Sequence, residues 1–225
     1  MSKNVIIIGG GYSVREGIEK NLWHKIQEKE IWSLNSVFKK MPYRPTKQLW
    51  VDAGFYKHEA DNLQKLFEKG VHLVAENNRV LENRKEILKF NTTRDKTQYR
   101  GLESANSNLI FKGRMGLTGI FSISLAISLQ YDEIFLLGFD WGSSSIENKN
   151  THWYQDEIEK LNIRSTGAGK PLIYMTRNDK IKDDITDFEV FLNMPSKIWN
   201  VSPNSNIPYF DKISYEEFFI KIKNN

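Results

Sequence analysis

The 225-residue sequence contains no cysteine. Disulfide bonds, thiolate catalysis and cysteine-ligated zinc are therefore excluded. Histidine is scarce, with four residues, and none lies in an H-x-x-H or H-E-x-x-H pattern, so no transition-metal site is indicated. The sequence also lacks a G-x-S-x-G elbow and a G-x-x-x-x-G-K-[ST] loop. Hydrolase and P-loop kinase chemistry thus have no support.

Long hydrophobic runs are missing as well. No apolar segment approaches the roughly 20 residues that cross a bilayer, and Met1 is followed almost at once by an apolar run. We therefore expect no transmembrane segment, no signal peptide and a cytoplasmic protein. An apolar fraction of 40% is ample for a core, so residues 1–225 are expected to form a single domain.

Charges of one sign do not gather in long runs. The net charge of +4 and the isoelectric point near 9.0 are a modest basic bias. This balance suits an anionic small substrate. A nucleic-acid partner remains a weaker alternative, because no basic run marks a nucleic-acid groove. The oligomeric state is not indicated.

The most informative segment begins with the β-branched run Val5–Ile8, which is typical of a buried strand. It leads into Gly9, Gly10 and Gly11, which allow a sharp turn and a close approach to a bound group. Ser13 and Glu16 have the spacing of a capping box and predict a helix start. Strand, glycine loop and helix N-terminus together favour a nucleotide or phosphate site. A tight turn without a ligand is the alternative, because a full G-x-G-x-x-G is absent.

Strand-like and helix-like segments alternate along the chain. We therefore predict an α/β fold, a Rossmann-like three-layer sandwich with a mainly parallel sheet. Lid-like insertions are expected near 77–108 and 143–170, where the sequence is polar and loop-like; surface insertions without a role are equally consistent. The expected strands are Val5–Ile8, Ile31–Leu34, Gln48–Val51, Val71–Ala75, Glu133–Leu137 and Lys197–Val201, and the expected helices are Val14–Ile26, His58–Lys69, Leu117–Leu129, Asp184–Leu192 and Tyr215–Ile222.

Three further segments place polar groups after strands or at helix starts. Thr118 and Gly119 open the apolar helix and predict a second anion-binding corner, or an N-cap with close helix packing. The run Gly138–Trp141 ends a buried strand with Asp140, which suits binding a hydroxyl, orienting a base or holding a magnesium ion, or capping a turn. The third segment, Ser202–Ser205, offers hydroxyls and amides for a nucleobase or ribose, or makes a simple turn.

Individual residues complete the predicted rim. Asn35 follows the second strand and Asp52 the third, and both would face a shared crevice in a doubly wound sheet. His152 lies in the loop after Asp140 and is the best candidate for a general base at neutral pH. Phe139 and Trp141 suit either flanking a base or sugar or packing in the core.

Taken in order, these segments resemble two related families. One is the bacterial lipooligosaccharide sialyltransferases, and the other is the 6-hydroxymethylpterin diphosphokinase-like family. Both tend to show an apolar strand into G-x-G-P-S-L, then T/S-G at a helix start, G-[FIY]-D after a strand, and C-P-N-S or S-P-x-S late in the chain. The matching residues here are Ile8–Val14, Thr118–Gly119, Gly138–Asp140 and Ser202–Ser205, with Asn35 matching an asparagine of the sialyltransferases.

The resemblance implies a nucleotide-binding α/β fold and a glycosyltransferase that uses a nucleotide-activated sugar. The acceptor would be a glycan hydroxyl or, more speculatively, a hydroxymethylated DNA base. The sequence has Tyr12 in place of the usual proline, and no histidine near 174–182 where the sialyltransferases carry their base. His152 or Asp140 would then act as base, and Thr151–His152 matches a Thr-His pair of the diphosphokinase-like relatives.

The residues expected around the nucleotide come from all of these segments. Asp52 and Trp141 are assigned to the donor or acceptor rim, and Arg114 adds a charge-assisted phosphate contact. Two alternatives stay open: a diphosphokinase with ATP and Mg²⁺ near Asp140 and Asp52, and a non-catalytic nucleotide-binding protein. The full nucleotide-binding set is Gly9, Gly10, Gly11, Ser13, Asn35, Arg114, Thr118, Gly119, Gly138, Phe139, Ser202 and Asn204.

Overall fold

The computed structural model describes residues 2–93, 101–105, 108–114, 117–141, 153 and 185–223; the side chains of 91–93, 101–105 and 108–114 are not described. The strands are β1 (Asn4–Ile8), β2 (Ile31–Leu34), β3 (Lys47–Trp50), β4 (His72–Glu76), β5 (Ile87–Thr93), β6 (Gly101–Ala105), β7 (Asn108–Arg114), β8 (Glu133–Leu137), β9 (Lys197–Asn200) and β10 (Asp211–Lys212). The helices are α1 (Val14–Glu19), α2 (Leu22–Ile26), α3 (Ala53–Glu68), α4 (Thr118–Ser128) and α8 (Tyr215–Lys223), with 3₁₀ turns η1 (Asn35–Lys40), η2 (Arg79–Leu81) and η4 (Asp187–Phe191).

The strands form one sheet in the order β10-β9-β8-β1-β2-β3-β4-β5-β7-β6. The eight strands from β10 to β5 run parallel; β7 also runs parallel to β5, and β6 is antiparallel to β7. Strand β1 lies between β2 and β8, so the winding direction reverses at the β1/β8 boundary. In open α/β sheets, ligands bind beyond the carboxyl ends of the strands at such a boundary.

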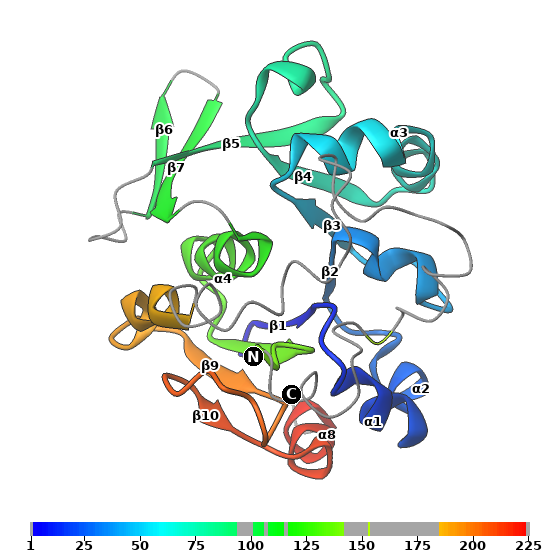
Figure 1. Cartoon of the computed structure of the whole chain (residues 1–225), viewed down its shortest axis with the longest axis vertical. Coiled ribbons are helices and arrows are strands. Elements are labelled where there is room, and N and C mark those ends of the chain that lie inside the picture. Colours follow the sequence, from blue (N-terminus) through cyan, green and yellow to red (C-terminus); the bar gives the residue numbers. More distant parts are fainter. Residues whose placement is uncertain are drawn as a thin grey trace.

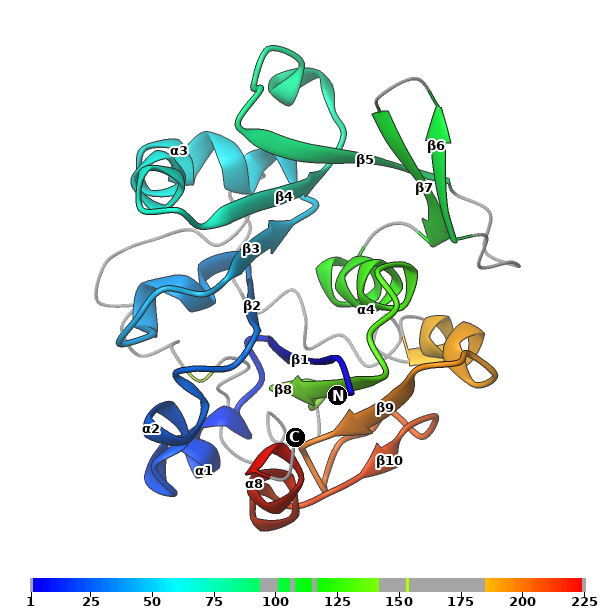
Figure 2. The same cartoon turned by 180° about the vertical axis from the view of Figure 1, so that it is seen from behind.

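Helices cover both faces of the sheet (Figures 1 and 2). Alternate strand residues such as Val5 and Ile7 pack with α4 and η4 on one face. Their neighbours Ile6 and Ile8 pack with α1, α2 and α8 on the other, and α3 covers the β3–β4 end of that second face. This is the predicted Rossmann-like three-layer α/β sandwich.

The polar segment after β4 differs from the prediction. Residues 77–108 were expected to form a lid-like loop, but β5 pairs with β4 and β6 pairs with β7. Ile87 and Phe90 bury their side chains, so β5 is held to the sheet by apolar contacts as well as by backbone pairing. The second expected insertion, near 143–170, lies outside the described residues apart from Trp153.

The first helix also differs from the prediction, because it is split in two. Asn21 has a φ of +64°, which ends α1 and starts α2 in a new direction. The segment near 184–192 gives the 3₁₀ turn η4 rather than a full α-helix. Within the described residues, no helix combines the length and hydrophobicity needed to cross a membrane.

Candidate active site

The glycine loop after β1 lies directly against the loop after β8. The Gly9 amide donates to the Leu137 carbonyl at 2.8 Å, and the Gly11 amide donates to the Gly138 carbonyl at 2.9 Å. A Cβ at Gly11 would lie 2.5 Å from the Gly138 oxygen and 2.8 Å from the Asp140 carboxylate. The glycines are thus needed for contact between two backbone segments, in addition to any approach to a ligand.

Asp140 links these two loops through Ser13. Its carboxylate accepts hydrogen bonds from the Ser13 amide at 2.7 Å and from the Ser13 hydroxyl. The predicted capping box is therefore wrong: the Ser13 side chain bonds Asp140, and Glu16 forms an ion pair with Lys20 instead of reaching back. A protein carboxylate already occupies part of the predicted anion site at this helix start, and the Gly11 and Ser13 amides are not available to a phosphate.

Phe139 brings the second predicted corner next to the first. Its ring lies between Gly9 and Gly119, and a Cβ at either glycine would contact it, at 3.4 Å and 2.9 Å respectively. The ring is 2% exposed. Phe139 thus packs in the core, and its predicted contact with a nucleotide stays a prediction. Gly138 is needed for the backbone conformation of this loop. Its φ of +72° and its contact with the Gly9 oxygen exclude a side chain.

Asn35 and Thr118 meet at the start of α4. The Thr118 hydroxyl donates to the Asn35 side-chain oxygen at 3.2 Å, across 83 positions of sequence. Asn35 has a φ of +50°, and its carbonyl accepts from the Gln48 side chain at 2.9 Å. No described side chain caps α4, and the first-turn amides of a helix have no intrahelical acceptor. These two predicted residues therefore do share one corner.

The segment after β9 fixes the backbone of the Asp140 loop. Asn200 and Ser205 both donate to the Phe139 carbonyl, at 3.2 Å and 2.6 Å, and the Asn206 amide donates to the Asp140 carbonyl at 3.0 Å. Ser202 is buried and Asn204 is exposed beside them. The structure therefore brings the Gly138–Trp141 and Ser202–Ser205 segments together, as predicted.

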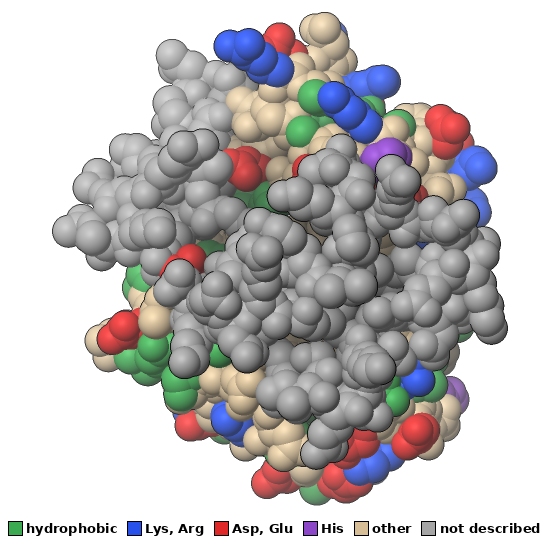
Figure 3. All heavy atoms as spheres, viewed as in Figure 1, with side chains coloured by type: hydrophobic (Ala, Val, Ile, Leu, Met, Phe, Trp, Pro, Cys, Tyr) green, Lys and Arg blue, Asp and Glu red, His purple; other side chains and the backbone are tan. Residues whose placement is uncertain are grey.

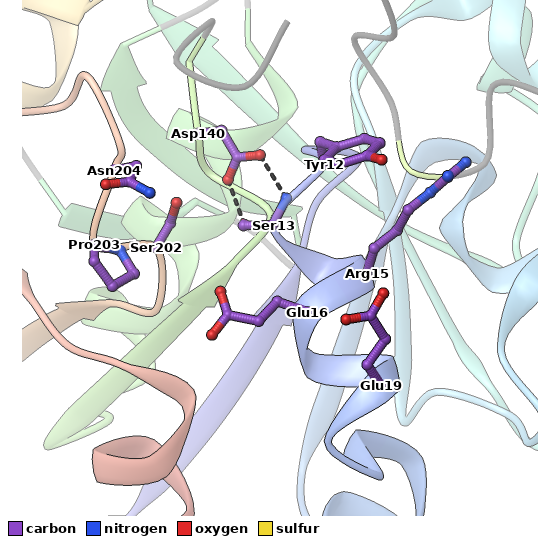
Figure 4. A pocket seen from close by; sticks show the side chains of 9 residues that line it. All are labelled: Tyr12, Ser13, Arg15, Glu16, Glu19, Asp140, Ser202, Pro203 and Asn204. Carbon is purple, nitrogen blue, oxygen red and sulfur yellow. Dashed lines mark hydrogen bonds between the residues drawn. The ribbon is translucent and has the colours of Figure 1, made fainter. Parts of the chain in front are cut away.

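A pocket of about 250 Å³ opens between α1, the Asp140 loop and the segment after β9 (Figure 4). Its lining combines predicted residues with four that sequence reasoning missed. The missed residues belong to α1 or to its start, where they read as ordinary surface positions. The lining residues are Tyr12, Ser13, Arg15, Glu16, Glu19, Asp140, Ser202, Pro203 and Asn204.

Trp153 packs on the glycine loop. Its backbone amide donates to the Gly10 carbonyl at 2.9 Å and its indole nitrogen to the Gly9 carbonyl at 3.3 Å, while Arg15 donates to the Trp153 carbonyl at 3.1 Å. The predicted base His152 precedes it in sequence but lies outside the described residues. The side chain of Arg114, at the end of β7, is also outside them.

The two rim residues have structural roles. Asp52 caps α3 by accepting the Gly54 amide at 2.7 Å. Trp141 packs edge-on against Phe188, with ring centroids 4.8 Å apart, and stacks near Phe139. Both residues thus have roles within the fold, and their assignment to a donor or acceptor rim stays a prediction. Among the described residues, no group of three or more His, Asp or Glu side chains is arranged to hold a metal ion.

Tyr215, in α8, packs against Gly17 of α1. Its ring would collide with a Cβ at Gly17, at 2.3 Å. Burial raises the pKa of the Tyr215 hydroxyl well above its ordinary value, and the nearby carboxylates of Asp140 and Glu16 raise it further. The hydroxyl therefore stays neutral, and it has no hydrogen-bond partner among the described residues.

Comparison with known proteins supports the fold. No family model matches the chain, and no curated protein matches it. A similar solved structure is the MAf glycosyltransferase from Magnetospirillum magneticum AMB-1, with a TM-score of 0.55 and 15% sequence identity. The match covers 96% of this chain and 34% of that protein, so the chain spans about a third of its length. At this identity the likeness establishes a shared α/β fold.

Proposed function

We propose that this protein is a glycosyltransferase that moves a sugar from a nucleotide-activated donor to a hydroxyl acceptor. The observation that carries the proposal is the convergence of the Gly9–Ser13, Gly138–Asp140 and Ser202–Asn204 segments beside the β1/β8 boundary. The fold similarity to a glycosyltransferase adds support, as does the sequence resemblance to sialyltransferases.

The start of α4 is the better place for the nucleotide phosphate. Amides in the first turn of this 11-residue helix favour an anion, and Asn35 and Thr118 add side-chain groups beside them. The start of α1 is less suitable, because the Asp140 carboxylate already accepts the Ser13 amide. A phosphate there would face a like charge.

In the proposed reaction, the acceptor oxygen attacks the anomeric carbon of the sugar. The bond from that carbon to the phosphate oxygen breaks, and the nucleotide leaves with both bonding electrons. Amides at the leaving phosphate stabilise its developing charge. A general base takes the proton of the acceptor hydroxyl.

Asp140 suits the role of a positioning residue better than that of the base. It is 2% exposed, and both carboxylate oxygens accept hydrogen bonds from Ser13. We therefore assign the base to His152, whose sequence neighbour Trp153 binds the glycine loop. His152→Ala is expected to lower the transfer rate by about 10²-fold or more with little change in nucleotide affinity.

The test is a transfer assay with cytidine-, uridine- and guanosine-activated sugars. It is paired with calorimetric binding of the corresponding free nucleotides and of ATP, each with and without Mg²⁺. We expect one nucleotide class to bind without added metal and its sugar to be transferred or slowly hydrolysed. Magnesium-dependent binding of ATP alone would instead favour the diphosphokinase. Nucleotide binding without any turnover would indicate a non-catalytic protein.

A further inference from the structure

The pocket beside α1 differs in charge from the α4 corner. Among the described residues that line it are three carboxylates, from Asp140, Glu16 and Glu19, and one guanidinium, from Arg15. Lys20 forms ion pairs with both Glu16 and Glu216, at 2.7 Å and 2.6 Å, so it balances part of the Glu16 charge. An anionic group in this pocket would be repelled by the carboxylates, whereas a cation would be attracted.

Arg15 offsets one of these three carboxylates, which leaves the described lining with a net charge of −2. Its guanidinium donates to the Trp153 carbonyl and lies over the Tyr12 ring at 4.8 Å. Asp140 keeps its orientation through the two hydrogen bonds from Ser13. The negative charge is thus held at one fixed position and extended by the more exposed carboxylates of Glu16 and Glu19.

Ser202 provides independent evidence for a ligand. Its side chain is 98% buried, with 2% exposed, yet its hydroxyl makes no hydrogen bond with any described residue. It lines the pocket, and in Figure 4 the hydroxyl lies on the side shared with Asn204 and Asp140. The Ser202 oxygen is not among the fully buried side-chain atoms that lack a partner, so it is open to the pocket. A ligand hydroxyl there can bond it both as donor and as acceptor.

We propose that this pocket is the acceptor subsite, and that it takes a hydroxyl-rich group carrying a protonated amine, such as an amino sugar. The role of this pocket as an acceptor subsite rests on the proposed transferase function. The binding of such a group does not. Ser202 and Asn204 bond the hydroxyls, and the Glu16 and Glu19 carboxylates attract the ammonium. The pocket then binds the cationic acceptor, and the start of α4 binds the anionic phosphate of the donor.

The experiment follows backbone amide shifts of the ¹⁵N-labelled full chain at low salt during titration with D-glucosamine, D-glucose and D-gluconate. These three probes are a cation, a neutral sugar and an anion of similar size. We expect D-glucosamine to bind at least about tenfold more tightly than D-gluconate, with the largest shifts at Glu16, Ser202 and Asn204. High salt should reduce the preference.

Variants assign the effect to the pocket. Glu19→Gln, at an exposed position, and Glu16→Gln/Glu19→Gln should each shrink the preference for D-glucosamine, the double variant to about threefold or less. Ser202→Ala should weaken D-glucosamine and D-glucose alike. Glu68→Gln/Glu82→Gln is the matched control, because it removes the same charge from exposed positions outside the pocket lining and should change nothing.

Nucleotide titration of the same samples separates the two proposals. Nucleotide binding without any preference for D-glucosamine would overturn the acceptor subsite and leave the transferase proposal standing. A D-glucosamine preference without nucleotide binding would overturn the transferase and with it the acceptor role. Equal affinity for D-glucosamine and D-gluconate, or shifts confined to other surfaces, would contradict the charge selection.

Discussion

Gly11 leaves no room for any side chain, because the Gly138 carbonyl and the Asp140 carboxylate both lie within 3 Å of where its Cβ would be. Gly11→Ala should therefore push the two loops apart, lower the free energy of unfolding by about 1–3 kcal/mol and weaken nucleotide binding. Urea denaturation and calorimetry would measure the two effects.

Gly70→Ala is the matched control for that substitution. Gly70 has a φ of +83° and no neighbour within 4 Å of the added methyl group. The variant should lose about 1 kcal/mol from backbone strain alone and keep its nucleotide affinity. If Gly11→Ala behaved in the same way, the close contact between the two loops would have no functional consequence.

The Ser13–Asp140 contact should couple two distant parts of the sequence. Ser13→Ala and Asp140→Asn each remove a hydrogen bond to a buried group, and each should cost about 1–3 kcal/mol. The double variant should lose less than the sum, with a coupling energy of about 1–2 kcal/mol. Additive losses in a double-mutant cycle would mean that the two residues act separately.

A short sequence motif does not show which atoms from distant parts of the chain will contact it. The sequence indicated the Gly9–Gly11 loop, Asp140 and Asn35 as neighbours, because strand ends of a parallel sheet share one edge. It could not indicate that the Asp140 carboxylate would accept a hydrogen bond from the Ser13 amide, since the two residues are 127 positions apart. Glu16 and Glu19 face the pocket, but in sequence they are ordinary polar positions of a helix.

At the scale of elements, strands with strong apolar content were predictable and polar ones were not. Ile31–Leu34 and Glu133–Leu137 coincide with β2 and β8, because their side chains are buried on both faces. Strand β6 carries Glu103 and Ser104 and has no such signal, and the apolar run Leu109–Phe111 of β7 is short and stands in a polar stretch. Their pairing depends on backbone hydrogen bonds to a partner, which a local pattern does not contain.

Glu30 ties the strand β2 to its neighbours and gives a pH-dependent prediction. It accepts hydrogen bonds from Trp32, Lys47 and Tyr131 at 2.8, 2.6 and 3.2 Å. Burial opposes ionisation of its carboxyl, but the hydrogen bonds from Lys47 and Trp32 leave its pKa below the ordinary 4.5. The ionised form therefore stabilises the fold above the unfolded-state pKa, and this contribution is lost as pH falls through the lowered folded-state pKa.

Glu30→Gln should thus lower the free energy of unfolding by about 1–2 kcal/mol at neutral pH. The difference from the wild type should shrink as pH falls through the lowered folded-state pKa of Glu30, where Glu30 itself becomes protonated. Denaturation curves at several pH values measure this directly. A difference that stayed constant with pH would show that the charge of Glu30 is not what matters.

At the scale of the whole molecule, the described surface does not carry one large patch of a single charge, and we propose that local charge directs each substrate to its subsite. In the view of Figure 3, acidic and basic side chains are interspersed around the described surface. The modest net charge of +4 gives little long-range attraction for a polyanion. Local fields at the α4 corner and in the acidic pocket therefore have more influence on which group binds where.

The proposed function depends on nucleotide binding at the carboxyl edge of the β1/β8 boundary. The most direct measurement is a titration of the ¹⁵N-labelled chain with CMP, UDP and ADP, followed by backbone amide shifts. We predict that one of these nucleotides perturbs residues 9–13, 35 and 117–119 together, without added metal. If no nucleotide perturbs these residues, or if the shifts map to a different edge of the sheet, the account is contradicted.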